Sequence, residues 1–304
     1  LKELITLRKG KNLSSIIYIP PLLHYSSGKA IPYVRNEYKT FKDEMKLICE
    51  VMKCDFYNFE SIVNDDLWGF KKMTSFRGNS KEIDFIEKDY GYKIEKKWID
   101  ELALHTQIVK KKSKLNYHHG RLLYSVLRKY IENNPKIKIF NIIETGTARG
   151  FSSLCMSKAL EDSEKVGRIF TIDIIPHNKK LYWNCIDDCE GKKTRNELLE
   201  KWRYYLDNIV FITGQSQEIL DSFYLKRINF AFLDAQHNYE NIKNEFDFVS
   251  DQQLKGDVII FDDVNVKEFP EIDRFINELK IKKIYDCKII NSSNKRSYCY
   301  ARKF

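Results

Sequence analysis

The sequence predicts an α/β protein in which a mostly parallel β-sheet forms the main domain. From about residue 116 onward, short apolar segments typical of strands alternate with segments whose apolar residues recur at helical spacing. Two final strand-like segments meet across a short polar turn at residues 291–294, which predicts an antiparallel hairpin at the edge of the sheet. We therefore expect a sheet domain over residues 116–304 and a mostly helical N-terminal extension over residues 1–115.

The expected strands of the sheet domain number seven. In chain order they are residues 138–143, 168–172, 209–212, 230–233, 258–261, 283–290 and 296–302. The accompanying helices are expected over residues 121–133, 152–160, 194–206, 239–249 and 270–279. Short apolar strands that alternate with helices indicate a parallel sheet covered on both faces. Because ligands of such folds bind beyond the carboxyl ends of the strands, the residues directly after each strand are the candidates for a site.

The N-terminal extension carries no recognisable chemical motif. It shows a short strand at residues 15–20, an amphipathic helix at 37–52 and two further helical stretches at 81–88 and 96–109. A lid, a substrate-binding region and an oligomerisation element, which would make the protein a homo-oligomer, are the roles that we consider for it. Its composition does not decide among them.

Composition excludes several classes of protein. Hydrophobic residues make up 43% of the chain and aromatic residues 13%, which excludes a disordered chain. The mean hydropathy is −0.49, and no apolar run approaches the ~18 residues of a membrane span. The sequence shows no signal-peptide pattern, and its seven cysteines lack the spacing of a disulfide framework. We therefore expect a cytoplasmic protein without a membrane span.

The formal charge of +9 does not by itself indicate a nucleic-acid partner. Residues 1–115 hold 22 basic and 16 acidic residues, whereas residues 116–304 hold 30 and 27. A dense basic cluster occurs only at residues 110–114, and elsewhere the charges alternate in sign as on a solvated surface. We therefore do not expect binding to nucleic acid.

The first strand is followed by a glycine-containing turn, Glu144-Thr-Gly-Thr-Ala-Arg-Gly150. Glycines at 146 and 150 let the backbone turn tightly and approach a ligand closely at the start of a helix. The spacing E-x-G-x-x-x-G differs from the G-x-G-x-x-G of dinucleotide-binding proteins. Asp173 ends the next strand, where a carboxylate can accept hydrogen bonds from both hydroxyls of a ribose. A glycine turn that binds nothing is the alternative.

Polar residues also follow the next three strands. Gln215 and Ser216 come after the third strand and could meet the edge of an adenine. Asp234 follows the fourth strand, and Asp262 and Asp263 follow the fifth. Three carboxylates at neighbouring strand ends are costly unless a hard divalent cation with oxygen ligands neutralises them. The alternative is that Asp234 caps the next helix and that the other two acids are solvated in a loop.

These motifs, taken in order, resemble a class I S-adenosylmethionine-dependent methyltransferase. They include Leu233-Asp-Ala-Gln-His-Asn-Tyr-Glu240 and Phe261-Asp-Asp-Val264, and the resemblance covers about residues 116–304. Within that class the chain is most similar to the metal-dependent O-methyltransferases, such as the catechol type and the sugar-tailoring enzymes of macrolide pathways. The resemblance implies a Rossmann-like sheet and S-adenosyl-L-methionine as the cofactor.

The resemblance also implies roles for particular residues. The cofactor would be bound by Glu144, Gly146, Thr147, Gly150, Asp173, Gln215, Ser216 and Asp234. Mg²⁺ or another hard divalent cation would be bound by Asp234, Asp262 and Asp263, and would lower the pKa of an acceptor hydroxyl. His237 matches a position that serves as general base in the sugar-modifying branch. Transfer of the methyl group would then depend mainly on alignment of the acceptor oxygen.

Departures from the family pattern bear on the acceptor. Ala235 and Gln236 replace a glycine and an acid, and Asp262-Asp263 stands where the catechol type has Asp-Asn. We therefore expect a hydroxyl of a small molecule, such as a sugar or a glycosylated metabolite, to be methylated. RNA ribose methylation and a non-catalytic cofactor-binding protein are the alternatives. The absence of an Asn/Asp-Pro-Pro-aromatic motif and of a Pro-Cys pair counts against methylation of nucleobases.

A few other residues allow a functional and a structural interpretation. Tyr117, His118 and His119 would lie over the cofactor by the resemblance, or would be surface residues. We do not expect structural zinc at Cys185 and Cys189, because the sequence has no C-x-x-C pair. The nearby aromatic residues Tyr182, Trp183 and Trp202 are expected to pack rather than to bind a nucleotide.

Overall fold

The computed structural model describes residues 80–107, 118–185, 191–265, 267–292 and 296–304. The chain from Phe76 to Phe304 forms one compact unit. The strand expected at residues 15–20 and the helix expected at 37–52 lie outside the described residues.

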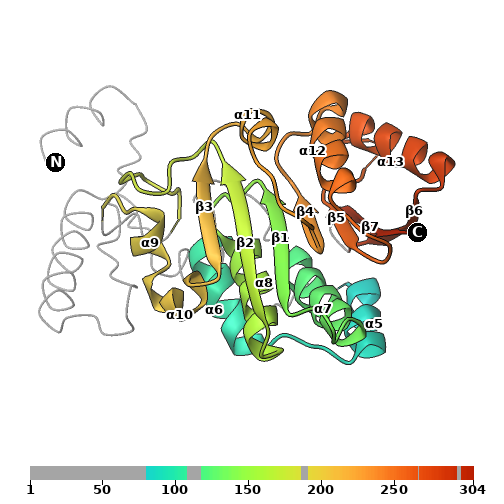
Figure 1. Ribbon diagram of the computed structural model, residues 1–304. Coiled ribbons are helices and arrows are strands. Elements are labelled where there is room, and N and C mark those ends of the chain that lie inside the picture. Colours follow the sequence, from blue (N-terminus) through green and yellow to red (C-terminus); the bar gives the residue numbers. More distant parts are fainter. Residues whose placement is uncertain (1–79, 108–117, 186–190, 266, 293–295) are drawn as a thin grey trace, which may run out of the picture. The chain divides into compact units, whose positions relative to one another are not determined.

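The sheet has seven strands in the order β3-β2-β1-β4-β5-β7-β6 (Figure 1). Their bounds are β1 (Ile139–Thr145), β2 (Val166–Asp173), β3 (Ile209–Thr213), β4 (Phe230–Leu233), β5 (Val258–Phe261), β6 (Tyr285–Asn291) and β7 (Ser297–Lys303). The first five strands are paired in parallel, whereas β7 runs antiparallel to both β5 and β6. The structure confirms the predicted Rossmann-like fold class with its antiparallel C-terminal hairpin.

The helices lie between the strands in sequence. They are α5 (Lys81–Tyr90), α6 (Lys96–Thr106), α7 (His118–Asn133), α8 (Phe151–Asp162), α9 (Arg195–Leu198), the 3₁₀ turn η3 (Glu200–Trp202), α10 (Arg203–Leu206), α11 (Ser216–Asp221), α12 (Tyr239–Asp251) and α13 (Pro270–Lys282). The single helix predicted over 194–206 is wrong, since this segment is divided into α9, η3 and α10. Leu199 and Trp202 are both buried at the 3₁₀ turn, where tertiary packing outweighs a regular helical period.

Two hydrophobic cores cover opposite faces of the sheet. Alternate residues of a strand belong to different cores, as the two-residue period of a strand requires. Thus Phe230 and Phe232 of β4 pack into the core formed with α7 and α8, whereas Ala231 and Leu233 pack into the core formed with α12 and α13. The predicted burial of both faces is confirmed for the central strands.

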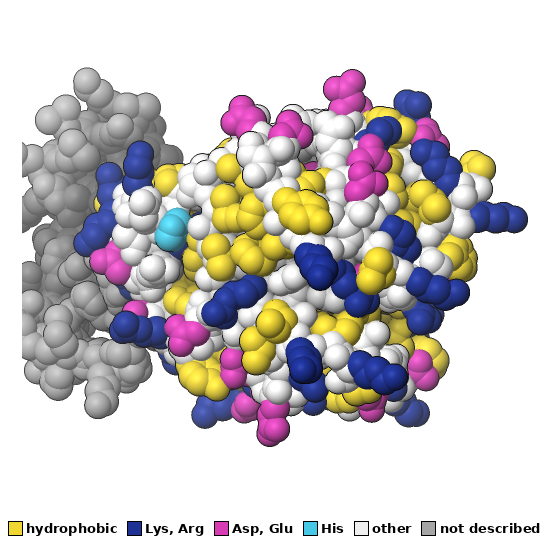
Figure 2. All heavy atoms as spheres, in the orientation of Figure 1, with side chains coloured by type: hydrophobic (Ala, Val, Ile, Leu, Met, Phe, Trp, Pro, Cys, Tyr) yellow, Lys and Arg dark blue, Asp and Glu magenta, His cyan; other side chains and the backbone are white. Residues whose placement is uncertain are grey.

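The outer strands are less completely covered. Val166 of β2 and Val210 of β3 are exposed, and Figure 2 shows hydrophobic side chains on this side of the molecule among scattered Lys and Arg. The short helix α11, which the sequence did not predict, follows β3 and has only six residues. A helix of this length is too short to cover the full length of two strands.

The two described helices of the predicted extension pack on the sheet domain. Ile83 of α5 and Leu102 of α6 are buried in the same core as α7 and α8. The buried side chain of Arg121 in α7 forms ion pairs with Asp84 and Glu87 of α5. The role predicted for residues 1–115, as a lid, a substrate region or an oligomerisation element, stays a prediction. Among the described residues, no helix is both long enough and apolar enough to cross a bilayer.

Candidate active site

The turn after β1 depends on glycine at two positions. Gly146 has a φ of 87°, and a Cβ atom there would lie 2.1 Å from the carbonyl oxygen of Asp234. Gly150 has a φ of 86° and is the N-cap residue of α8. Both left-handed conformations favour glycine, and no side chain fits at position 146. The backbone after β1 is therefore in direct contact with the backbone after β4.

Glu144 is a fully buried carboxylate at the end of β1. The hydroxyls of Ser152 and Ser153, in the first turn of α8, donate hydrogen bonds to its two carboxylate oxygens. Burial raises the pKa of Glu144, and the bonds from the serines act in the opposite direction. The two serines were not singled out from the sequence, although the start of a helix directly after the glycine turn was the signal for them.

Asp173 lies at the end of β2 and holds the glycine turn in place. Its Oδ2 accepts a hydrogen bond from the N–H of Ala148 at 2.6 Å, and its Oδ1 accepts one from the N–H of Ile175 at 2.8 Å. The guanidinium of Arg195 lies 3.9 Å from Oδ2. A carboxylate can accept about four hydrogen bonds, so it keeps capacity for a ribose hydroxyl. The buried hydroxyls of Thr147 and Thr171 are hydrogen-bonded to each other at 2.5 Å.

The loop after β3 presents its two candidate residues differently. Gln215 is exposed and is the N-cap residue of α11, whereas Ser216 is half-buried in the first turn of that helix. Ser216 also interacts with Glu245 of α12, a buried residue that the sequence did not suggest. Glu245 accepts a hydrogen bond from the hydroxyl of Thr145, directly before Gly146. Glu245 thereby links the end of β1 to the start of α11.

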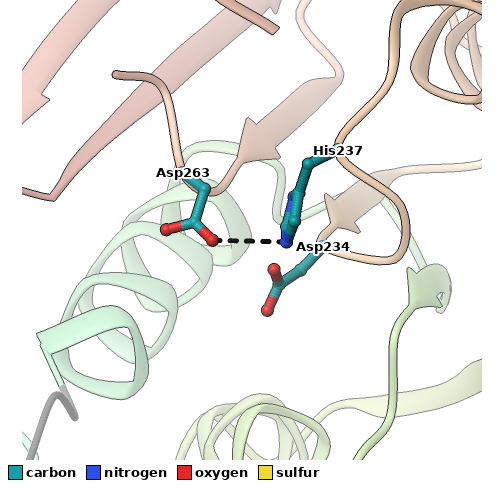
Figure 3. Close-up of side chains that lie close together, drawn as sticks. All are labelled: Asp234, His237 and Asp263. Atoms are coloured by element: carbon teal, nitrogen blue, oxygen red, sulfur yellow. Dashed lines mark ion pairs between the residues drawn. The ribbon is translucent and has the colours of Figure 1, made fainter. Parts of the chain in front are cut away.

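Asp234, His237 and Asp263 come together at the ends of β4 and β5 (Figure 3). One ligand atom from each of the three lies within 4.8 Å of the others, and His237 Nε2 lies 3.5 Å from Asp263 Oδ2. Figure 3 shows the imidazole of His237 pointing toward both carboxylates. We call these three residues the acidic group.

Asp262 lies beside the acidic group but is held in another way. Its Oδ1 accepts a hydrogen bond from the N–H of Asp263 at 2.6 Å. Asp262 and Asp263 are only 3% and 4% exposed, so the interpretation of these acids as solvated loop residues is wrong. The helix-cap interpretation of Asp234 is wrong as well, because Asn238 is the N-cap residue of α12. The roles predicted for Asp234, Asp262, Asp263 and His237 stay predictions.

Electrostatics in this region favour a bound positive charge. Burial, followed by the charges of Asp262 and Asp263, raises the pKa of Asp234 well above its usual value. Burial, followed by the charge of Asp263, raises the pKa of Asp262 to about 7. Burial also raises the pKa of Asp263, while Arg296 and His237 act to lower it. Three carboxylates so placed repel one another unless a cation lies among them.

The donor set fits a divalent cation. The carboxylates of Asp234 and Asp263 are the oxygen ligands that hard ions such as Mg²⁺ and Mn²⁺ prefer, whereas the imidazole of His237 is a softer ligand. Asp263 Oδ1 is buried and, among the described residues, has no hydrogen-bond partner. It does form an ion pair with Arg296, whose Nη1 lies 3.2 Å away.

Arg296 is a site residue that the sequence analysis did not identify. It directly precedes β7, and the antiparallel register of β5 with β7 continues beyond the strands, since Val264 N–H donates to Ser297 O at 2.9 Å. Arg296 therefore lies opposite the acid pair that follows β5. The register between β5 and β7 is the signal that could have located it.

The histidines at the start of α7 are buried, which contradicts their interpretation as surface residues. His119 packs between the rings of Phe151 and Phe232. Burial, followed by the charges of Arg296 and His118, lowers the pKa of His119 to about 3, so its imidazole is neutral. Tyr117 lies outside the described residues.

The remaining candidates are mainly structural. Trp183 and Trp202 are buried in the core, as expected, whereas Tyr182 is exposed. Cys185 is buried, and Cys189 lies outside the described residues.

Comparisons with known proteins agree with the resemblance seen in the sequence. Residues 143–264 match the family model described as a methyltransferase domain. A comparison with curated protein sequences finds no match.

Three of the solved structures that resemble this chain are the following. The O-methyltransferase from Bacillus cereus in complex with SAH is 15% identical, with 75% of this chain and 93% of that chain covered and a TM-score of 0.46. The O-methyltransferase TomG from Streptomyces achromogenes, involved in tomaymycin synthesis, is 14% identical, with 76% and 94% covered and a TM-score of 0.47. A putative rRNA-methylase from Clostridium thermocellum is 12% identical, with 58% and 95% covered and a TM-score of 0.41.

Residues 143–264 therefore resemble a methyltransferase domain, in agreement with the class I, S-adenosylmethionine-dependent type expected from the sequence. The residues that match the family model run from β1 through the acid pair after β5, and so include nearly all of the candidate site. The sequence-based assignment to this class is confirmed.

Proposed function

We propose that the protein is a divalent-cation-dependent O-methyltransferase that transfers the methyl group of S-adenosylmethionine to a hydroxyl of a small molecule. The observation that carries this proposal is the acidic group, with three potential ligand atoms within 4.8 Å, next to the glycine turn. The contact between Gly146 and the Asp234 carbonyl places the acidic group beside the glycine turn. A methyl donor at the turn and an acceptor at the acidic group would be neighbours.

The cofactor would be held by the loops after β1, β2 and β3. In this proposal the turn from Glu144 to Gly150 binds the methionine part, and Asp173 accepts hydrogen bonds from the ribose. Gln215 and Ser216 lie by the adenine. S-adenosylmethionine supplies an electrophilic methyl group on a sulfonium, so the chain's own contribution is alignment of donor and acceptor.

The acidic group would bind a divalent cation and the acceptor. Asp234 and Asp263 are the ligands in this proposal, with Asp262 buried beside them. A bound divalent cation supplies Lewis acidity, which lowers the pKa of a hydroxyl that it contacts. An acceptor with two neighbouring oxygens, such as a sugar or a glycosylated metabolite, suits such a site.

His237 is the proposed general base. Its side chain is 34% exposed, and its Nε2 faces Asp263 Oδ2 at 3.5 Å. A carboxylate at this distance can hold the imidazole in place for proton transfer. The exposure of the ring gives the proton a route to solvent.

The proposal is tested by calorimetry and a transfer assay on the full chain. S-adenosylmethionine should bind with measurable heat, and methyl transfer to glycosides with neighbouring hydroxyls should stop with a chelator and return with Mg²⁺. Catechols and a short RNA serve as comparison acceptors. Asp234→Asn should abolish transfer, whereas Asp247→Asn, at an exposed ion pair on α12, should not change it. Full turnover in the presence of chelator would refute the requirement for a cation.

A further inference from the structure

Arg296 is the positively charged residue of the candidate site. Its guanidinium contacts Asp263 Oδ1 at 3.2 Å, while Oδ2 of the same carboxylate faces His237. In the described part of the chain, no other Lys or Arg forms an ion pair with Asp234, Asp262 or Asp263. Arg296 and His237 thus lie at opposite oxygens of the Asp263 carboxylate.

The charge of Arg296 interacts with several ionisable groups of the candidate site. Burial alone lowers the pKa of Arg296, but the charges of Asp263 and Asp262, followed by Tyr298 and Asp234, raise it above its usual value. The guanidinium also lowers the pKa of buried His119. Its side chain is 42% exposed, so the interaction is partly screened by solvent.

We propose that Arg296 is a fixed counter-charge that sets how tightly the acidic group binds a divalent cation. This inference rests on the proposed function, because it assumes that a cation binds there. Asp263 adds a carboxylate to the site, and Arg296 offsets its charge while leaving Oδ2 directed toward His237. Arg296 is a positioning residue in this account, since it acts through Asp263.

The physical basis is repulsion between the guanidinium of Arg296 and a cation bound at the same carboxylate, that of Asp263. A divalent ion bound near Oδ2 lies within several ångströms of the guanidinium at Oδ1. At that separation the repulsion is large enough, even with solvent screening, to change the dissociation constant by about tenfold or more. Arg296 therefore weakens cation binding and keeps the ion exchangeable.

To test this inference, the full chain is titrated with Mn²⁺ alone at fixed pH and ionic strength. Binding is monitored by electron paramagnetic resonance or calorimetry. Arg296→Gln should bind Mn²⁺ about tenfold more tightly than the wild type. Arg296→Lys keeps the charge and should bind as the wild type does. Asp263→Asn should bind more weakly, and the double variant Asp263→Asn/Arg296→Gln, which has the net charge of the wild-type site, should return toward wild-type affinity.

The outcomes separate this inference from the proposed function. If the wild type binds Mn²⁺ and Arg296→Gln binds no more tightly, the counter-charge role is wrong and the cation site stands. If Arg296→Lys behaves as Arg296→Gln does, the shape of the guanidinium rather than its charge matters, which also overturns the inference. If no variant binds Mn²⁺, both this inference and the cation requirement fail.

Matched controls exclude indirect effects. Arg203 forms an exposed ion pair with Glu200 in the segment before β3, so Arg203→Gln removes an arginine ion pair that does not involve the acidic group. It should leave Mn²⁺ affinity unchanged. Thermal melting and S-adenosylmethionine binding check that each variant is folded, and a variant that melts early is replaced by Arg296→Met, for which the same tighter binding is expected.

Discussion

The hydroxyl of Thr145 donates a hydrogen bond to Glu245 Oε2 at 2.8 Å, which links the end of β1 to the middle of α12. Glu245 is 1% exposed, and its other oxygen, Oε1, is buried with no hydrogen-bond partner among the described residues. Burial raises the pKa of Glu245, and the neutral hydroxyls of Ser216 and Thr145 act to lower it. A carboxylic acid in such a place keeps its proton to an unusually high pH.

Glu245 is therefore expected to make stability depend on pH. Burial raises its pKa from 4.5 to about 7, so the folded protein retains a proton that the unfolded chain loses. The free energy of unfolding should fall as the pH rises from about 4.5 to about 7, by about 3 kcal/mol at most. Urea unfolding at several pH values should show that this fall is smaller in Glu245→Gln.

The control for this prediction is Glu240→Gln, an exposed residue in the first turn of the same helix. It should keep the pH dependence of the wild type. Equal pH dependence in Glu245→Gln and the wild type would show that Glu245 is not protonated in the folded protein at neutral pH.

Gly146→Ala should be strongly destabilising and should impair cofactor binding. The new Cβ would lie 2.1 Å from the carbonyl oxygen of Asp234, and the φ of 87° adds strain. Gly91→Ala is a matched control, because Gly91 has a φ of 77° but nothing within 4 Å of its Cβ position. The control should lose only about 1–2 kcal/mol.

Urea unfolding and calorimetry with S-adenosylmethionine measure the difference between the two variants. Equal losses of stability in both would show that backbone strain, and not the contact between the two turns, explains the need for glycine at position 146.

His237→Ala should lower the rate of methyl transfer by about 10²-fold or more while leaving S-adenosylmethionine affinity unchanged. Mn²⁺ affinity distinguishes the two roles that the geometry allows for His237. A general base that does not bind the ion should leave Mn²⁺ affinity nearly unchanged. A large loss of Mn²⁺ affinity would instead identify His237 as a metal ligand.

Asp173→Asn should weaken S-adenosylmethionine binding by about tenfold or more. The substitution removes the negative charge that favours ribose hydroxyl donors, and the new amide meets the N–H of Ala148 or Ile175. Asp221→Asn, at the end of α11 and exposed, is the control and should bind the cofactor normally. Calorimetry measures both variants, and equal affinities would remove Asp173 from the proposed ribose site.

Much of the sheet and of the site followed from sequence because both depend on local patterns. Apolar runs in the sequence predicted the positions of the strands. Because the strands are parallel, the residues that follow each of them lie at the same edge of the sheet. Glu144, Asp173 and Asp234 became candidates in this way, because each directly follows one of the expected strands. The proximity of Asp234 and Asp263 follows from the adjacency of β4 and β5 in the sheet.

The rest depended on packing and backbone geometry that no local pattern carries. Asp263 has a φ of 53°, a left-handed conformation uncommon outside glycine, which affects how the two adjacent acids are directed. Arg296 is brought to them only by the register of β7. The interruption of the helix at Leu199 and Trp202 likewise reflects tertiary packing.

The position of β7 has a consequence for biosynthesis. This strand lies between β5 and β6 although both precede it in the chain. On the ribosome, β5 would therefore keep an unpaired edge until β7 has been translated, and the acids that follow β5 would lack Arg296 until then. Exposed strand edges invite pairing with other chains. The nascent protein should thus be most prone to misassembly just before its last strand emerges.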